Sequence, residues 1–218
     1  AAPPERKPKP MILIGQYDSP FVRRVGIALS LYGLPFQHKP WSTFGDADKI
    51  RPYNPLTRVP TLVLDDGEVL IESHSILDHL DSLVPPAQAM FPRTEPDRRR
   101  ALKVAALATG LADKAVSLFY EKRLHSAASD LWVERCRTQI AGVLAALQAD
   151  RASRPGDYWF GERIGHADIA VAVALRFLGE AHPGVAPLNE FPALAAHAGR
   201  LEALPVFQRV AQPFIPPS

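Results

Sequence analysis

In this chain of 218 residues, hydrophobic patterns typical of strands occur only in the first part, and the second part has helical patterns alone. This division constrains the fold more than any other feature of the sequence. Short apolar runs, one helical pattern and an Asp-Gly turn fill the first part. Four prolines follow within residues 84–96, and beyond them only helical patterns occur. We therefore predict an α/β domain followed by an all-helical domain. The expected boundaries are a flexible leader at 1–10, the α/β domain at 11–84, a linker at 85–96 and the helical domain at 97–218.

The first part opens with a predicted strand–helix–strand unit. Residues 11–15 (MILIG) and 36–39 are expected strands, and residues 21–32 have helical spacing. Ser19 is a good N-cap for this helix, and Pro20 suits its first position because the N–H that proline lacks would have no partner there. A crossover of this kind makes the two strands parallel.

A hairpin and a second helix are predicted to complete the α/β domain. Residues 41–58 show little periodicity and are expected to be irregular. Residues 61–71 contain an Asp-Gly turn between two β-branched runs, which is a strong hairpin signal. A helix is predicted over 75–83, with Ser75 and Asp78 as its capping signal. The resulting order is β-α-β followed by β-β-α.

Only helices are predicted in the second part, with long amphipathic patterns at 97–123 and 130–150 and one or two further helices over 191–204. A more apolar helix is expected to begin after Gly165 and to lie at the centre of the domain. The carboxylate of Asp168, at its third position, can accept a free backbone N–H at the helix start. The last residues, 214–217, are predicted to form a tail.

Composition excludes several classes of protein. Twenty-five basic and 23 acidic residues leave a net charge of +2, too small to predict nucleic acid or an anionic membrane as a partner. The longest apolar run, 169–175, is too short to cross a bilayer. Cys136 is the single cysteine, so we expect no internal disulfide, no cysteine-based metal site and a cytoplasmic protein. The seven histidines form no metal-binding motif.

Two places in the α/β domain could carry chemistry, although each also has a purely structural interpretation. Ser19 can simply cap its helix, or its hydroxyl can donate to an anion at the helix N-terminus. It does not resemble a hydrolase nucleophile, because a Gly-x-Ser-x-Gly turn is absent. Glu72 and Ser73 can cap a helix or hold the charged end of a ligand. By frequency alone, the Val59-Pro60 bond is expected to be trans, since only about 5% of such bonds are cis.

Four segments taken together resemble a known family. Residues 17–25 read YDSPFVRRV, residues 54–62 read NPLTRVPTL, and Glu72-Ser73 precedes a helix. Residues 165–170 read GHADIA, which looks like a capping motif of a central helix. Their order and separations resemble the glutathione transferase superfamily over most of the chain. The similarity is greatest to bacterial members with a Ser-Pro-Phe-Val-Arg start.

The resemblance implies a thioredoxin-like N-terminal domain that binds glutathione and a helical C-terminal domain that covers an acceptor. It implies a cis bond at Val59-Pro60, with the Val59 backbone pairing with the cysteinyl part of glutathione as an added strand would. Glu72 and Ser73 would bind the γ-glutamyl ammonium and carboxylate. Arg58 would lie near the glycyl end.

Ser19 is the catalytic residue that the resemblance implies. A thiol titrates near 8.5, and a hydroxyl donor at a helix N-terminus can lower that pKa by about one or two units, so that more thiolate forms at neutral pH. Tyr17 is the alternative donor, because a phenol does this in some branches of the family. Branches that form mixed disulfides have cysteine where this chain has Ser19, so disulfide reduction is not expected.

One position departs from the family pattern. The family commonly has serine or threonine where this chain has Gly165. Glycine lacks the side-chain acceptor, but as an N-cap it costs only a few tenths of a kcal/mol. The fold prediction therefore stands.

Three kinds of function follow from the resemblance. The first is a glutathione transferase, typical of detoxification, that adds the thiolate to a small electrophilic or hydrophobic molecule. Phe119 and Tyr120 are either walls for that acceptor or ordinary core and interface aromatics. The second is a glutathione-dependent isomerase or dehalogenase, and the third is a non-catalytic binding protein of the same fold. Ser19, Arg58, Val59, Glu72 and Ser73 favour glutathione binding over the third. Glutathione is then a co-substrate, no metal is expected, a homodimer is implied, and the acceptor is not identified.

Overall fold

The computed structural model describes residues 9–217, so residues 1–8 of the predicted leader lie outside the described residues. The N-terminal domain contains a four-stranded sheet in the order β2-β1-β3-β4. The strands are β1 (Met11–Ile14), β2 (Phe36–Lys39), β3 (Thr61–Val63) and β4 (Val69–Ile71). β1 pairs with β2 in parallel, as predicted, and β3 pairs with β1 and β4 in antiparallel fashion.

Alternating strand residues divide the apolar core between the two faces of the sheet. Leu13 and Leu62 pack with α1 (Pro20–Leu31) and α3 (Ser73–Ser82) in the main core, while Ile14 and Val63 pack with Ile50 in a smaller cluster. Ile50 ends α2 (Ala47–Ile50), a short helix within a segment that we predicted to be irregular. A single turn of helix is too short to produce a periodic signal.

Two helix starts test the capping predictions. Ser19 is the N-cap of α1, where its Oγ accepts from the backbone N–H of Val22 at 3.4 Å, and Pro20 is the first helical residue. The prediction for α3 was wrong, because that helix begins at Ser73 and Ser75 lies inside its first turn. Glu72 takes the cap position with a φ of 71°, which turns the chain from β4 directly into the helix.

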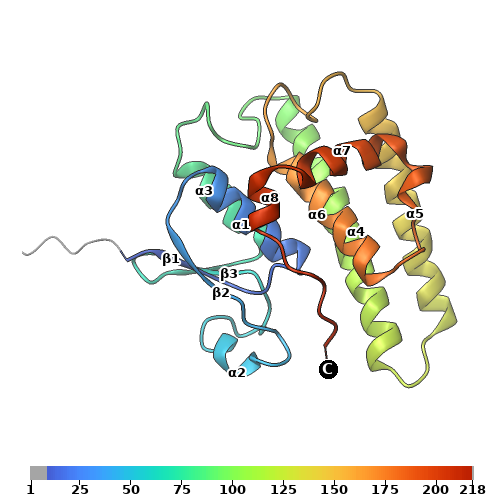
Figure 1. The fold of residues 1–218 in the computed structure, drawn as a ribbon. Coiled ribbons are helices and arrows are strands. Elements are labelled where there is room, and N and C mark those ends of the chain that lie inside the picture. Colours follow the sequence, from blue (N-terminus) through green and yellow to red (C-terminus); the bar gives the residue numbers. More distant parts are fainter. Residues whose placement is uncertain (1–8, 218) are drawn as a thin grey trace, which may run out of the picture.

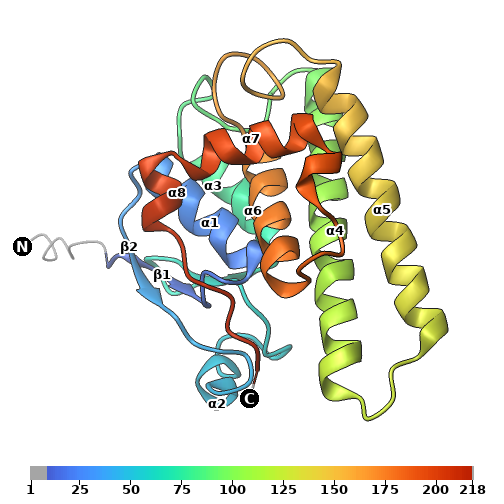
Figure 2. The ribbon, with the colours of Figure 1, turned by 45° about the vertical axis from the view of Figure 1, so that its right-hand side comes forward.

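The C-terminal domain is helical, as predicted, and Figures 1 and 2 show its helices arranged around α6. Its elements are α4 (Asp97–Leu124), α5 (Asp130–Ala152), α6 (His166–Ala181), the 3-10 turn η1 (Leu188–Glu190), α7 (Pro192–Glu202) and α8 (Pro205–Arg209). Most of α6 is buried, and it packs against α4, α7 and α1, so it joins the two domains. Cys136 of α5 is fully buried and acts as a small core residue.

The start of α6 explains why this chain has glycine at its N-cap. The Gly165 N–H donates to Asp168 Oδ2 at 2.8 Å, which confirms the predicted role of Asp168. A Cβ at residue 165 would lie 2.9 Å from the carbonyl oxygen of Met90 in the linker. The backbone of His166 also donates to that oxygen, at 3.2 Å. A side chain at Gly165 would therefore separate the linker from α6.

Asp168 is expected to make the folded protein more stable as the pH falls, which is opposite to the usual effect of an aspartate. Burial raises the pKa of its carboxyl to about 6, although hydrogen bonds from the N–H groups of Gly165 and Trp159 favour the charged form. The native state then binds a proton more tightly than the unfolded state, whose pKa is near 3.9, so stability increases as the pH falls between these values. Relative to Asp168→Asn, we expect the wild-type protein to gain about 2–3 kcal/mol of unfolding free energy from pH 7 to pH 4. Urea titrations at both pH values measure the difference, and parallel changes in the two proteins would contradict it.

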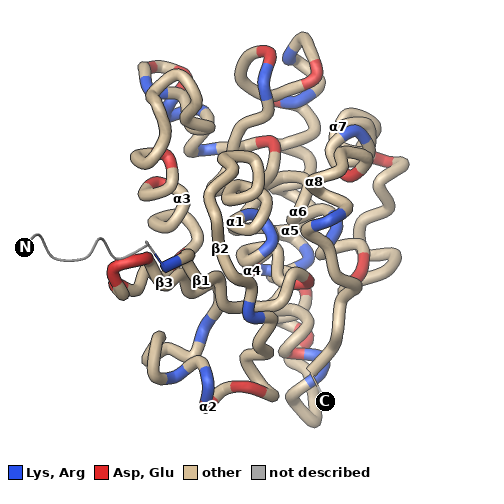
Figure 3. Tube along the Cα trace, turned by 60° about the vertical axis from the view of Figure 1, so that its left-hand side comes forward, with Lys and Arg blue, Asp and Glu red and all other residues tan. Residues whose placement is uncertain are grey.

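Charged residues of both signs are spread over the described part of the chain. Figure 3 shows basic and acidic residues interspersed along the trace, and the net charge of the full chain is +2. None of the helices between residues 9 and 217 has both the length and the apolar character needed to span a membrane. Within the same residues, no three His, Cys, Asp or Glu side chains are grouped so that they could hold a metal ion.

Candidate functional site

Two adjoining cavities lie where the N-terminal domain meets α4. The small cavity, about 340 Å³, includes Glu72 and Pro60 in its lining, and the large cavity, about 770 Å³, includes Ser19. Arg58 and Val59 line both, as does Asp113 of α4. One elongated ligand could therefore reach from the start of α3 to the start of α1.

The loop before β3 is shaped by a buried amide. Val59-Pro60 is cis, as the resemblance implied and against the expectation from frequency alone. Asn54 is almost fully buried, and its Nδ2 donates to the Arg58 carbonyl at 3.0 Å and to Thr61 Oγ1 at 3.1 Å. Its Oδ1 accepts from the backbone N–H of Leu56 at 3.0 Å. No role was predicted for Asn54 from the sequence, although a polar residue directly before a proline was a usable signal.

The backbone of Val59 can extend the sheet. Pairing between β1 and β3 begins at Ile14 and Thr61, so Val59 lies just outside the ladder. Between residues 9 and 217 its N–H and C=O make no hydrogen bond to other backbone groups. Because Val59 also lines both cavities, an extended peptide lying there could pair with it as a further strand.

Glu72 and Ser73 mark the N-terminus of α3 beside the small cavity. The positive φ of Glu72 is uncommon for a residue with a side chain, and such conformations cluster at ligand-binding sites. Its side chain is exposed and leaves the helix N–H groups uncapped, so these remain available to an anionic ligand. Ser73 is almost fully buried, and its Oγ lies 3.5 Å from Glu72 Oε1. Glu72 lines the small cavity and the side chain of Ser73 does not.

A buried positive charge lies near the same helix start. Arg24 of α1 is buried, and its three side-chain nitrogens have no hydrogen-bond partner in residues 9–217. Burial lowers its pKa to about 10, while the charge of Glu72 opposes that shift. At neutral pH the guanidinium keeps its charge, and it adds a positive potential to that of the α3 N-terminus.

Geometry separates the two candidate thiol-activating residues. Ser19 lines the large cavity, and within residues 9–217 its hydroxyl accepts one hydrogen bond and donates none. Tyr17 is not among the residues that line either cavity. Its ring stacks on His38 with centroids 3.9 Å apart and lies against Gly26, and burial raises its pKa to about 12. The position of Ser19 is therefore better suited to contact a ligand.

Aromatic side chains form much of the large cavity, which extends toward the C-terminal domain. Phe119 and Tyr120 line it, as predicted from the sequence, and Phe44 packs edge-on against Tyr120 with ring centroids 5.7 Å apart. Phe214 and the residues after it line the cavity too, although the sequence analysis predicted only a tail there. Of the two acidic side chains in the lining, Asp18 is partly buried, and burial raises its pKa.

Comparison with protein families gives two matches in chain order. Residues 13–88 match a model described as the N-terminal domain of glutathione S-transferase, and residues 130–200 match one described as its C-terminal domain. The chain is 33% identical over 139 residues to an uncharacterized GST-like protein, YibF, of Escherichia coli (strain K12). That match covers 63% of this chain and 68% of YibF.

Solved structures of the same family superpose over nearly the whole chain. A glutathione S-transferase from Methylobacterium radiotolerans, in complex with glutathione sulfonate, has a TM-score of 0.87 at 29% identity and covers 96% of this chain and 100% of its own. A glutathione transferase family member from Pseudomonas fluorescens Pf-5, with bound glutathione, has a TM-score of 0.80 at 30% identity, covering 94% and 100%. The fold of both is therefore shared by this chain.

Proposed function

This chain belongs to the glutathione S-transferase family, and from that membership we propose that it activates the glutathione thiol for attack on an electrophile. Glutathione occupies the small cavity and reaches the start of α1, while the acceptor occupies the large cavity. The observation that supports this proposal is that Arg58 and Val59 line both cavities, with Glu72 in the lining of the small one and Ser19 in that of the large one.

Each end of glutathione has a complementary group in this arrangement. The carboxylate of Glu72 accepts from the γ-glutamyl ammonium, and the N–H groups at the start of α3, that of Ser73 among them, bind the γ-glutamyl carboxylate. The backbone of Val59 pairs with the cysteinyl residue. Arg58, whose side chain is exposed at the cavity rim, lies near the glycyl carboxylate.

The chemistry follows from the position of the sulfur beside Ser19. The thiol loses its proton to solvent, and the Ser19 hydroxyl donates a hydrogen bond to the resulting thiolate near the positive end of α1. The thiolate then forms a carbon–sulfur bond with the acceptor. With an organic halide the carbon–halogen bond breaks and halide leaves. The same thiolate would serve an isomerase or dehalogenase, so the choice of acceptor separates these reactions.

Several further properties belong to the same proposal. We expect a homodimer that acts in the cytoplasm in detoxification, without a metal. The acceptor is a small electrophilic or hydrophobic molecule, because the large cavity is lined by aromatic rings from the loop after β2, from α4 and from the end of the chain.

Calorimetry with glutathione tests the binding step directly. Wild-type protein is expected to bind glutathione, and Glu72→Ala is expected to bind it about 10- to 150-fold more weakly, because a charge-assisted hydrogen bond contributes roughly 1.5–3 kcal/mol. Glu68→Ala, at an exposed turn position outside both cavities, is the matched control and should bind like wild type. Absence of binding at millimolar glutathione would reject the proposed function. A turnover panel of aryl halides, alkyl halides and cis-alkene acids then separates transfer from dehalogenation and isomerisation.

A further inference from the structure

The segment after α8, residues 211–217, crosses from the C-terminal domain to the turn before α1, and we call it the strap (Figure 2). Its last four described residues, 214–217, line the large cavity. The Phe214 ring meets Phe119 edge-on with centroids 4.9 Å apart and Phe177 with centroids 5.5 Å apart. The strap is therefore one wall of the proposed acceptor site, although it has no secondary structure to hold it.

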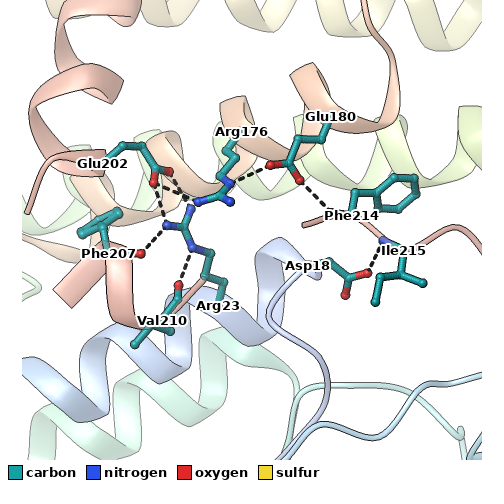
Figure 4. Close-up of polar contacts among 9 residues, drawn as sticks. All are labelled: Asp18, Arg23, Arg176, Glu180, Glu202, Phe207, Val210, Phe214 and Ile215. Atoms are coloured by element: carbon teal, nitrogen blue, oxygen red, sulfur yellow. Dashed lines mark hydrogen bonds and ion pairs between the residues drawn. The ribbon is translucent and has the colours of Figure 1, made fainter. Parts of the chain in front are cut away.

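Two carboxylates hold the strap by its backbone. Three of the five residues from 213 to 217 are prolines and lack an N–H. In this part of the strap, Phe214 and Ile215 therefore provide the only backbone N–H donors. The N–H of Phe214 donates to Glu180 Oε2 at 3.0 Å, and that of Ile215 donates to Asp18 Oδ2 at 3.0 Å (Figure 4). Glu180 belongs to α6 of the C-terminal domain, and Asp18 belongs to the turn before α1 of the N-terminal domain. The N–H groups of two consecutive strap residues are therefore bound by carboxylates from different domains.

The carboxylate of Glu180 is itself fixed by a chain of ion pairs. Arg176 donates to Glu180 Oε1 at 2.9 Å and to Glu202 Oε2 at 3.3 Å. Arg23, which is buried in α1, binds both oxygens of Glu202 at 2.6 and 2.7 Å. Arg23 also donates to the carbonyl of Val210, directly before the strap, at 2.7 Å. The network in Figure 4 thus fixes both the beginning and the middle of the strap.

We propose that Asp18 and Glu180 are positioning residues that determine acceptor specificity by holding the strap against the large cavity. This inference rests on the proposed function, since it assigns the acceptor to that cavity. With the strap bound, the site takes a flat acceptor that fits beside the Phe214 ring. Without the two carboxylates the strap leaves the wall, the acceptor loses contacts, and larger acceptors are admitted.

The kinetic test compares acceptors in the double variant Asp18→Ala/Glu180→Ala. We expect the KM for a chlorodinitrobenzene to rise about five- to tenfold, while the glutathione KM changes less than about twofold, since none of the strap residues lines the small cavity. The ratio of kcat/KM for a two-ring chloromethylnaphthalene over the one-ring acceptor should increase. Asp18→Asn/Glu180→Gln keeps a carbonyl acceptor for each N–H and should recover most of the wild-type behaviour. Glu134→Ala, exposed on α5, is the control.

Chymotrypsin cleavage after Phe214, followed by mass spectrometry, reports on the strap without any need for activity. Cleavage should be at least tenfold faster in Asp18→Ala/Glu180→Ala than in wild type or Glu134→Ala. Equal cleavage rates, or an unchanged acceptor KM in the double variant, would overturn this inference. Failure of the wild-type protein to bind glutathione would instead reject the proposed function, and the cleavage result would still show whether the carboxylates hold the strap.

Discussion

Ser19→Ala is expected to lower kcat at pH 7 by up to about 25-fold while leaving the affinity for glutathione nearly unchanged. A thiol with a pKa near 8.5 is about 3% ionised at pH 7, and a pKa that the hydroxyl and the helix N-terminus together lower by about one or two units raises that fraction to about 25% or 75%. The ratio of these fractions sets the largest loss of rate expected when the hydroxyl is removed. Binding is preserved because Glu72 and Val59 contact other parts of glutathione in the proposed pose. Calorimetry gives the affinity, and initial rates with a chlorodinitrobenzene at saturating glutathione give kcat.

The pH dependence of this deficit identifies its cause. As the pH rises past the pKa of the free thiol, near 8.5, glutathione ionises without help, so the rates of wild type and Ser19→Ala should converge above about pH 9.5. A deficit of constant size at every pH would show that Ser19 acts in another way. Tyr17→Phe is the control for the alternative donor and should keep wild-type kcat, because the Tyr17 side chain lines neither cavity. Loss of activity in Tyr17→Phe with full activity in Ser19→Ala would transfer the role to Tyr17.

Ser19 also caps α1, so a loss of stability must be separated from a loss of chemistry. Replacing an N-cap serine by alanine costs about 1 kcal/mol, whereas glycine costs only a few tenths. Ser19→Gly removes the hydroxyl with little effect on the helix start. We expect it to match Ser19→Ala in kcat and wild type in its urea midpoint.

Local sequence signals predicted the elements whose causes are local. Ser19 and Pro20 placed the start of α1, the Asp-Gly turn placed the β3–β4 hairpin, and Asp168 placed the start of α6. Each of these elements depends on contacts between residues that are close in the sequence, so residue type and spacing are enough to predict it. The cis bond at Val59-Pro60 was predicted from the resemblance to a family, because residue frequencies alone favoured a trans bond.

Contacts between distant parts of the chain were not predictable in this way. From the sequence Gly165 looked like a weak cap, but the structure has the carbonyl oxygen of Met90 only 2.9 Å from where a Cβ would lie. The strap looked like a tail because its partners, Asp18 and Glu180, are about 197 and 34 residues away from the groups they bind. Nothing in a hydrophobic pattern reports which carboxylate a distant backbone N–H will meet.

Asp81, near the end of α3, also binds groups that are distant in the sequence. Its carboxylate connects α3 to three other parts of the fold. Its Oδ1 accepts from the Tyr32 hydroxyl at 2.5 Å and from His166 Nε2 at 2.7 Å, and its Oδ2 accepts from the backbone N–H of Phe91 at 3.0 Å. These donors come from the end of α1, from α6 and from the linker. Burial opposes ionisation of Asp81, but the hydrogen bonds from His166, Tyr32 and Phe91 together outweigh it and hold the pKa below its usual range.

Asp81→Ala is therefore expected to lower the free energy of unfolding by about 3–5 kcal/mol, because it leaves three donors without their acceptor in a site where Asp81 is 2% exposed. Asp78→Ala is the matched control on the same helix, since its side chain is 63% exposed and lies 3.8 Å from Arg98, and it should change stability by less than about 0.5 kcal/mol. Asp81→Asn keeps one acceptor oxygen and should fall between them. Urea denaturation of the three variants at pH 7 measures these differences. Similar unfolding midpoints for Asp81→Ala and Asp78→Ala would show that the linker and α6 are held to α3 by apolar packing rather than by this carboxylate.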